Sequence, residues 1–248
     1  MPSAVGAVVC VPTYDEAGNI ERMVRALGEV LDLERDRVLV IDDASPDGTG
    51  AIADRLAGEL PWVEVLHRDR KRGIGPAYVA GFRHALAAGA AAVAQIDCDF
   101  SHDPADLPRL LAPVAAGEAD LVLGSRYVAG GSTANWSLLR RAISAGGCLY
   151  ARVLLGVGIR DLTGGFKCIR GEVLEQIGLD TLTAHGYAFQ IETTYRALRA
   201  GFRVLEVPIR FVDRRVGSSK MSRGVVTEAA WRVPALRLRA IAGRLERH

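Results

Sequence analysis

The first half of the chain alternates between short apolar runs of strand length and longer segments in which apolar residues recur at helical spacing. Strand patterns cover residues 7–12, 37–42, 62–66, 92–96 and 120–124, and helical patterns cover residues 19–31, 49–60, 76–88 and 105–115. The strand patterns are rich in Val, Ile, Leu and Ala without polar alternation, which is typical of strands buried on both faces. Such strands with helices between them predict an α/β fold: a mostly parallel, Rossmann-like sheet with helices on both faces.

The second half of the chain is less regular. It begins with a glycine-rich loop and then shows helical patterns at residues 138–155, 188–200 and 231–247, and a strand pattern at residues 204–212. No linker of disordered composition and no internal repeat divides the chain. We therefore expect a single domain, in which residues 1–213 form the α/β body and residues 214–248 add a basic loop and a C-terminal amphipathic helix.

The net charge of +2 conceals an uneven distribution along the chain. Residues 214–248 contain nine Lys and Arg against two Asp and Glu, whereas residues 1–213 contain 22 against 27. A dedicated nucleic-acid-binding domain is usually basic throughout, so we expect no nucleic-acid partner.

The spacing within residues 231–247 gives the last helix two different faces. Trp231, Leu238 and Ile241 share an apolar stripe, while most of the arginines lie on the other side. Interfacial helices have this pattern, with cations toward lipid head groups and an aromatic anchor. A terminal helix packed on the body of a protein can have it too, and the sequence leaves both interpretations open.

Several other classes are disfavoured. The four cysteines show no CxxC spacing, which argues against a zinc site or a disulfide scaffold. The N-terminus lacks the basic region of a signal peptide. The longest apolar run, residues 142–159, contains Arg152 and four glycines and makes a poor membrane span. These features predict a soluble, cytoplasmic chain.

Carboxylates follow three of the predicted strands. Glu16 comes after the first, Asp42 and Asp43 end the second, and Asp97 and Asp99 follow the fourth. In an open parallel sheet, ligands bind at the carboxyl ends of the strands, so these side chains converge on one edge. Clustered carboxylates are costly unless a cation neutralises them, and oxygen ligands suit Mg²⁺ or Mn²⁺.

Other motifs of strand-to-helix turns are absent. There is no GxGxxG or GxxxxGK[ST] and no GxSxG, which disfavours a dinucleotide-binding domain, a P-loop NTPase and a serine hydrolase. Asp47 and Asp103 stand just before predicted helices, and we expect them to act as helix caps rather than as ligands.

Four ordered motifs in the first half resemble the family-2 inverting glycosyltransferases with the GT-A fold: VCVPTYDE at residues 9–16, VIDDASPDG at 40–48, DCD at 97–99 and GSRY at 124–127. Further motifs resemble, within that family, the dolichyl-phosphate (polyprenyl-phosphate) mannosyltransferases: NWSLLRR at residues 135–141, DLTGGFK at 161–167, GYAFQIE at 186–192, EVPIRFVDR at 206–214 and SKM at 219–221. The resemblance covers nearly the whole chain, and it implies that residues 1–213 are a GT-A catalytic domain.

The resemblance implies an activity. Such enzymes transfer mannose from GDP-mannose to a polyprenyl monophosphate with inversion, giving polyprenyl β-phosphomannose and GDP, with Mg²⁺ or Mn²⁺ as cofactor. Two alternatives remain open: a UDP-glucose-dependent polyprenyl-phosphate glucosyltransferase, and a non-catalytic nucleotide-sugar-binding module that docks a membrane partner.

The resemblance also assigns roles to residues. The guanine nucleoside is held by Pro12, Tyr14, Glu16 and by Asp42 or Asp43. The metal and sugar diphosphate are held by Asp97 and Asp99, with Ser101 where relatives commonly have Gln. The acceptor phosphate is held by Arg126, Arg140 and Ser144. The donor phosphates are contacted from a loop by Arg214 and Lys220. The catalytic residues are accordingly Asp99, Arg126, Arg140 and Lys220.

The chemistry agrees with these assignments. A phosphate monoester carries nearly two negative charges at neutral pH and is a nucleophile without a general base. The site needs cations to bring two anionic substrates together, and Arg provides a bidentate fork for phosphate. The metal and Lys220 would stabilise charge on the departing diphosphate. Because the acceptor is a lipid, we expect peripheral association with the cytosolic face of a membrane through the C-terminal arm; recruitment by a separate membrane protein stays open.

Overall fold

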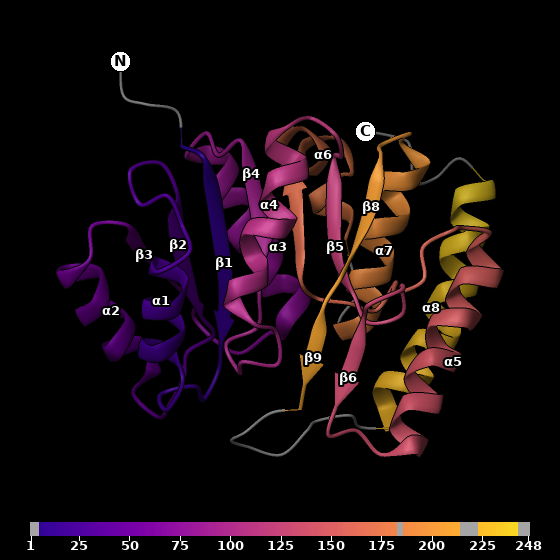
Figure 1. Ribbon diagram of the computed structural model, residues 1–248, viewed down its shortest axis with the longest axis horizontal. Coiled ribbons are helices and arrows are strands. Elements are labelled where there is room, and N and C mark those ends of the chain that lie inside the picture. Colours follow the sequence, from indigo (N-terminus) through magenta and orange to yellow (C-terminus); the bar gives the residue numbers. More distant parts are fainter. Residues whose placement is uncertain (1–4, 183–185, 214–222, 243–248) are drawn as a thin grey trace.

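The computed structural model describes residues 5–182, 186–213 and 223–242, and it has a central seven-stranded sheet (Figure 1). The strands lie in the order β3-β2-β1-β4-β7-β5-β8. Their bounds are β1 Ala7–Thr13, β2 Arg37–Asp42, β3 Val63–His67, β4 Ala92–Gln95, β5 Leu121–Ser125, β7 Lys167–Arg170 and β8 Val204–Pro208. All pairs are parallel except the two that β7 makes with β4 and β5. The predicted mostly parallel α/β sheet is confirmed.

Helices cover both faces of the sheet. One core lies under α3 Ile74–Ala87, α6 Gly171–Gln176 and α7 Gly186–Arg199, with α5 Leu138–Leu155 and α8 Arg223–Ile241 beyond them. The other core lies under α1 Ile20–Gly28, α2 Thr49–Glu59 and α4 Leu107–Ala115. Successive residues of β1 alternate between the two cores, Val8 and Cys10 in the first and Val9 and Val11 in the second. Both faces of this strand are therefore apolar, as its sequence indicates.

The strand predicted at residues 204–212 is two strands. β8 ends at Pro208, and β9 Arg210–Val212 pairs with β6 Ser132–Ala134 in a separate two-stranded sheet. Pro208 has no N–H to continue the ladder of the main sheet. The buried Ile209 links the two sheets, since its N–H donates to the carbonyl of Ser125 and its own carbonyl accepts from Ser132.

The antiparallel strand β7 is not anticipated by the sequence pattern. It is only four residues long, follows Gly164 and Gly165, and lies between β4 and β5. The short 3-10 helices η1 Pro104–Asp106 and η2 Leu179–Thr181 precede α4 and α7.

The C-terminal helix differs from its prediction in its bounds, and it combines features of the two interpretations that the sequence leaves open. Within the described residues α8 runs over Arg223–Ile241, so Pro234 lies inside it. Val233, Leu236 and Ala240 are buried, and the helix packs against α5 and α7. The predicted apolar stripe faces outward: Trp231 is 81% exposed, Leu238 67% and Ile241 71%. The helix is thus packed on the body and still presents an apolar stripe to its surroundings.

Strand β7 carries a buried lysine. The Nζ of Lys167 is enclosed in the core and donates a hydrogen bond to the backbone oxygen of Gln190 at 2.7 Å. Burial lowers the pKa of Lys167 to about 7, and the negative charge of Asp161 offsets only part of this effect. The unfolded chain, with a lysine pKa of about 10.4, therefore binds more protons than the folded chain between pH 7 and pH 10. Burial of Lys167 thus costs stability below pH 7, and the cost disappears as the pH rises through this window.

We expect Lys167→Met to raise the free energy of unfolding more at pH 6 than at pH 9.5. At pH 6 the variant avoids burial of a charge, with an expected gain on the order of 2 kcal/mol after loss of the hydrogen bond. At pH 9.5 the folded lysine is neutral and most of the cost has gone, and the lost hydrogen bond offsets the part that remains, so the gain should nearly vanish. Urea denaturation of both proteins at the two pH values measures the difference. An equal gain at both would show that Lys167 does not titrate in this window.

Candidate active site

One cavity at the carboxyl ends of the strands brings together predicted site residues from distant parts of the sequence. Its volume is about 240 Å³, and the predicted site residues that line it are Asp97, Asp99, Ser101, Arg126 and Arg140. The cavity therefore joins the predicted metal ligands to the predicted acceptor-phosphate arginines. Ser144, predicted beside the arginines, is not among the lining residues; its Oγ accepts a hydrogen bond from the hydroxyl of Tyr127 at 2.7 Å.

The acidic wall of the cavity is the loop after β4. Phe100 has a left-handed backbone with φ 57°, and this turn lets the N–H of Ser101 donate to Oδ1 of Asp99 at 2.9 Å. From α3, the hydroxyl of Tyr78 donates to Oδ1 of Asp97 at 3.2 Å. Two carboxylates and one hydroxyl are hard oxygen donors and fit Mg²⁺ or Mn²⁺. Within the described residues, no three His, Cys, Asp or Glu side chains are placed together to hold a metal.

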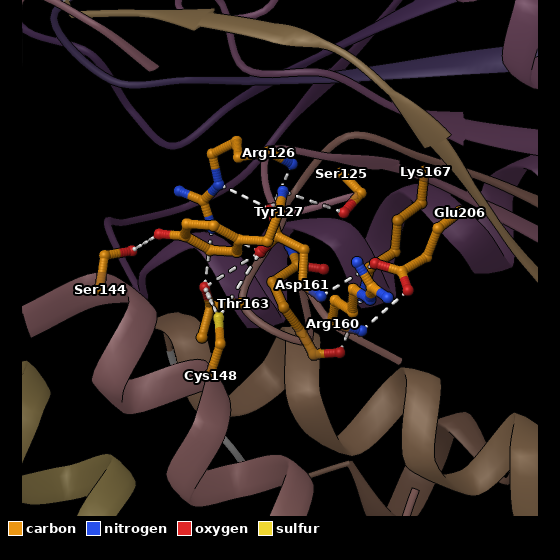
Figure 2. A network of polar contacts seen from close by, with 11 residues as sticks. Ser125, Arg126, Tyr127, Ser144, Cys148, Arg160, Asp161, Thr163, Lys167 and Glu206 are labelled. Carbon is orange, nitrogen blue, oxygen red and sulfur yellow. Dashed lines mark hydrogen bonds and ion pairs between the residues drawn. The ribbon is translucent and has the colours of Figure 1, made fainter. Parts of the chain in front are cut away.

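The basic wall is built on a buried ion pair that the sequence did not reveal (Figure 2). Nε and Nη2 of Arg126 donate to the two carboxylate oxygens of Asp161 at 2.7 and 2.6 Å, and Nη2 also donates to Thr163 Oγ1 at 2.8 Å. Burial alone would raise the pKa of Asp161, but the charge and hydrogen bonds of Arg126 outweigh it and lower that pKa. Arg126 is thus held rigidly and largely neutralised. The only sequence signal for its partner is that Asp161 opens the DLTGGFK motif.

Arg140 lies on the first turn of α5, where its backbone N–H donates to the N-cap Ser137. Its Nη1 donates to Asp213 Oδ2 at 2.5 Å. The Trp136 ring lies 4.4 Å from the Arg140 guanidinium carbon and 5.5 Å from that of Arg126. One indole therefore contacts both arginines, and such cation–π contacts stabilise their charged forms.

Unpartnered polar atoms collect in this cavity. Within the described residues, four side chains that line it each carry a buried atom without a hydrogen-bond partner: His102 Nδ1, Trp136 Nε1, Arg140 Nε and Gln190 Oε1. Each such atom costs roughly 1–3 kcal/mol, which a bound ligand can recover by pairing with it. Burial lowers the pKa of His102 to about 4, so its ring is neutral at pH 7 and adds no charge to the two arginines. The cavity is built for a polar ligand.

The predicted nucleoside-binding residues form a second group, outside this cavity. Pro12 and Tyr14 lie at the end of β1, and the Tyr14 ring is 3.4 Å from Lys71 Nζ. Glu16 Oε2 accepts from the Asn19 amide at 2.7 Å.

Asp42 and Asp43 hold the loops at the end of β2. Asp42 Oδ1 accepts from the Ser45 hydroxyl at 2.5 Å. Asp43 accepts from the Arg68 guanidinium and from the backbone N–H groups of Arg72 and Gly73. The basic run RDRKR at residues 68–72 therefore lies beside the predicted nucleoside site, although no motif in the sequence marks it.

Of the two predicted caps, Asp103 is confirmed: it is the N-cap of η1 and accepts from the N–H of Ala105 at 3.0 Å. The N-cap of α2 is Gly48, so the cap predicted at Asp47 is wrong; Asp47 lies one residue earlier and accepts from the N–H groups of Thr49 and Ala17, which ties the two loops together. Arg214 and Lys220, predicted to contact the donor phosphates, lie outside the described residues.

A mostly parallel sheet with an acidic loop after β4 and a basic wall facing the same cavity is the arrangement of a GT-A glycosyltransferase. The profile of Glycosyl transferase family 2 matches residues 8–178, and the chain belongs to this family.

Individual relatives and structures agree with this assignment. The chain is 49% identical over 220 residues, 88% of each chain, to an undecaprenyl-phosphate mannosyltransferase of Micrococcus luteus. It is 46% identical over 241 residues to a polyprenol monophosphomannose synthase of Mycolicibacterium smegmatis, covering 97% of this chain and 89% of that one. A glucosyl-3-phosphoglycerate synthase of Mycobacterium tuberculosis, solved with Mn²⁺, UDP and glucosyl-3-phosphoglycerate, has the same fold with a TM-score of 0.66 at 20% identity, covering 98% of this chain and 80% of that chain.

Proposed function

We propose that this glycosyltransferase moves mannose from GDP-mannose to a polyprenyl monophosphate with inversion and releases GDP. Two relatives that match most of the chain are named for transfer of mannose to such lipids. The observation that carries the proposal is the single cavity lined by Asp97 and Asp99 together with Arg126 and Arg140. It allows a sugar diphosphate and a second phosphate to meet.

The basic wall suits the acceptor. A polyprenyl phosphate is close to a dianion at neutral pH, and one of its oxygens can attack the anomeric carbon without first losing a proton. Arg126 and Arg140 line this wall, each with its charge offset by a carboxylate, Asp161 or Asp213, and the unpartnered Trp136 Nε1 and Arg140 Nε supply two N–H donors for phosphate oxygens. We assign Ser144 to the edge of this site through its hydrogen bond with Tyr127.

The acidic wall suits the donor. Asp97, Asp99 and Ser101 would hold Mg²⁺ or Mn²⁺, which offsets the negative charge of a diphosphate leaving group. The nucleoside would lie along Pro12, Tyr14 and Glu16 and at Asp42 or Asp43, with the basic run at residues 68–72 beside it. We assign Arg214 and Lys220 to the donor phosphates, as their motifs imply.

An exposed apolar surface fits the lipid part of the acceptor. Helices α5 and α8 lie side by side (Figure 1), and their exposed apolar side chains define what we name the α5–α8 surface: Leu138, Leu139, Leu149, Val153, Trp231, Leu238 and Ile241. Leu138 and Leu139, 82% and 70% exposed, directly precede Arg140. A lipid whose phosphate contacts Arg140 would have its chain on this surface.

We propose that the α5–α8 surface rests on the cytosolic face of a membrane and that α8 is part of the same domain as residues 1–213, since it shares their core. No helix in the described part of the chain has both the length and the apolar character to cross a bilayer. Large exposed apolar side chains gathered on two neighbouring helices are typical of a surface that binds lipid or protein.

Replacing Val153, Trp231 and Leu238 by Ser is expected to weaken binding to anionic vesicles at least tenfold. Each change removes exposed apolar area that would otherwise be buried in lipid. Vesicle co-sedimentation measures the partition, and Leu33→Ser, a change of another exposed leucine outside this surface, is the control. Unchanged binding by the triple variant would remove the α5–α8 surface as the membrane contact.

A donor assay tests the proposed function. The protein is incubated with a short-chain polyprenyl phosphate, Mg²⁺, and either GDP-mannose or UDP-glucose labelled in the sugar. We expect label to enter the lipid phase from GDP-mannose. Transfer from UDP-glucose instead would identify a glucosyltransferase, and transfer from neither would favour a non-catalytic nucleotide-sugar-binding module.

A further inference from the structure

Gln190 is a buried residue of the cavity to which no role has yet been assigned. It lies near the start of α7, is 4% exposed, and lines the same cavity as Asp97 and Asp99. Its Oε1 is buried and has no hydrogen-bond partner. A side-chain amide placed this way on a helix wall can pair with a ligand.

The Gln190 amide and the Asp97 carboxylate both lie close to Gly165. A Cβ atom on Gly165 would lie 3.5 Å from Nε2 of Gln190 and 3.8 Å from Oδ2 of Asp97. The two side chains therefore flank Gly165, close enough for one hexose ring to reach both. A larger residue at position 165 would occupy this space.

The surrounding structure holds Gln190 in place. Its backbone oxygen accepts from Lys167 Nζ at 2.7 Å and from Thr194 Oγ1 at 3.1 Å. The preceding residue, Phe189, stacks on the ring of Tyr78, with ring centroids 6.0 Å apart, and the Tyr78 hydroxyl donates to Asp97. The amide and the carboxylate are thus linked through one rigid packing unit, which is the condition for a preorganised site.

The carbonyl oxygen of the Gln190 amide, Oε1, can pair only with certain groups of a ligand. A carbonyl oxygen pairs with a hydrogen-bond donor or with a cation, and phosphate oxygens of either substrate offer neither when ionised. A role as a metal ligand would lower the affinity for GDP in the presence of Mg²⁺ together with that for GDP-mannose, so the affinity for GDP distinguishes the two roles. The hydroxyls of a hexose are donors and acceptors, and an amide can pair with both functions. We infer that Gln190 determines sugar specificity by hydrogen bonding to a hydroxyl of the transferred hexose. The inference rests on the proposed function, since it assumes a sugar nucleotide in this cavity.

Gln190→Met keeps the length of the side chain and removes the amide. We expect the affinity for GDP-mannose, measured by calorimetry with Mg²⁺ and without acceptor, to fall 10- to 100-fold, because a site that has lost its partner for a hydroxyl binds that ligand less well. The affinity for GDP, which has no hexose, should stay within twofold, and Tm should not fall. Gln176→Met, on the exposed side of α6, is the matched control and should change none of these values.

Deoxy analogues of GDP-mannose identify the hydroxyl. One analogue should bind the wild type 10- to 100-fold more weakly than GDP-mannose does, but should bind Gln190→Met as well as GDP-mannose does. Each of the other analogues should show the same loss relative to GDP-mannose with both proteins. The inference would be overturned if, for every analogue, the loss caused by the missing hydroxyl simply added to the loss caused by Gln190→Met. It would also be overturned if Gln190→Met lowered the affinity for GDP as much as that for GDP-mannose. Absence of transfer by a wild type that still binds GDP-mannose through Gln190 would contradict only the proposed function, whereas absence of all sugar-nucleotide binding would contradict both.

Discussion

Asp99→Asn is expected to lower the rate of sugar transfer at saturating Mg²⁺ by roughly a thousandfold, about 4 kcal/mol in the activation free energy. The substitution keeps the shape of the side chain and its ability to accept from the N–H of Ser101, so the loop after β4 should keep its turn. What it removes is a negative charge from the cavity that would hold the cation and the donor diphosphate. The rate is measured with labelled GDP-mannose, and Mn²⁺ binding in the presence of GDP is measured by calorimetry.

Asp103→Asn is the matched control. It lies four residues further on and caps η1 through the N–H of Ala105. It does not line the cavity that holds Asp97 and the two arginines, although it lines a neighbouring cavity that Asp99 also borders. We expect it to keep activity and metal affinity within about threefold. Asp99→Asn with normal metal affinity and normal turnover would remove Asp99 from the metal site, and equal losses in both variants would point to damage of the loop instead.

Most of the architecture follows from the sequence, for a definite physical reason. Strands buried on both faces need uninterrupted apolar runs, so β2 has the bounds that its pattern predicts, 37–42. The helix α5 has its predicted bounds, 138–155, because Ser137 caps its start and the left-handed Gly156 ends it. The antiparallel β7 could not be found this way, since its place between β4 and β5 is decided by long-range pairing. For α8 the sequence leaves open whether the apolar stripe faces the body or the surroundings. Its spacing shows which residues share a side, but not that Val233 and Leu236 would form the buried side.

The candidate site also has a part that the sequence predicts and a part that it does not. Asp97, Asp99, Arg126 and Arg140 stand in motifs, and the structure brings them to one cavity. Their environment depends on residues far away in the sequence. The carboxylate of Asp161 reaches Arg126 across 35 positions. No local sequence pattern indicates such a pairing. From the sequence, Arg126 is therefore expected to be a cation without a counter-charge, whereas in the structure Asp161 neutralises it.

Asp161→Asn is expected to destabilise the fold by about 3–5 kcal/mol, because it leaves the Arg126 guanidinium buried without a counter-charge. Arg126 has 6% of its side chain exposed and Asp161 none. In a chain of this size, such a loss corresponds to a fall in Tm of roughly 10 °C. Thermal denaturation followed by circular dichroism measures it. Glu21→Gln, which breaks exposed ion pairs with Arg25 and Arg55, is the control and should shift Tm far less.

The double variant Arg126→Met, Asp161→Leu separates stability from function. Replacing a buried ion pair by apolar residues of similar volume is often neutral or stabilising, so most of the lost Tm should return. Sugar transfer should not return, because the acceptor phosphate would have lost one of its two arginines. A double variant that is folded and active would show that Arg126 serves only the fold. A single variant Asp161→Asn with unchanged Tm would show that water or another group already compensates the charge of Arg126, and the rigid basic wall would then have no structural basis.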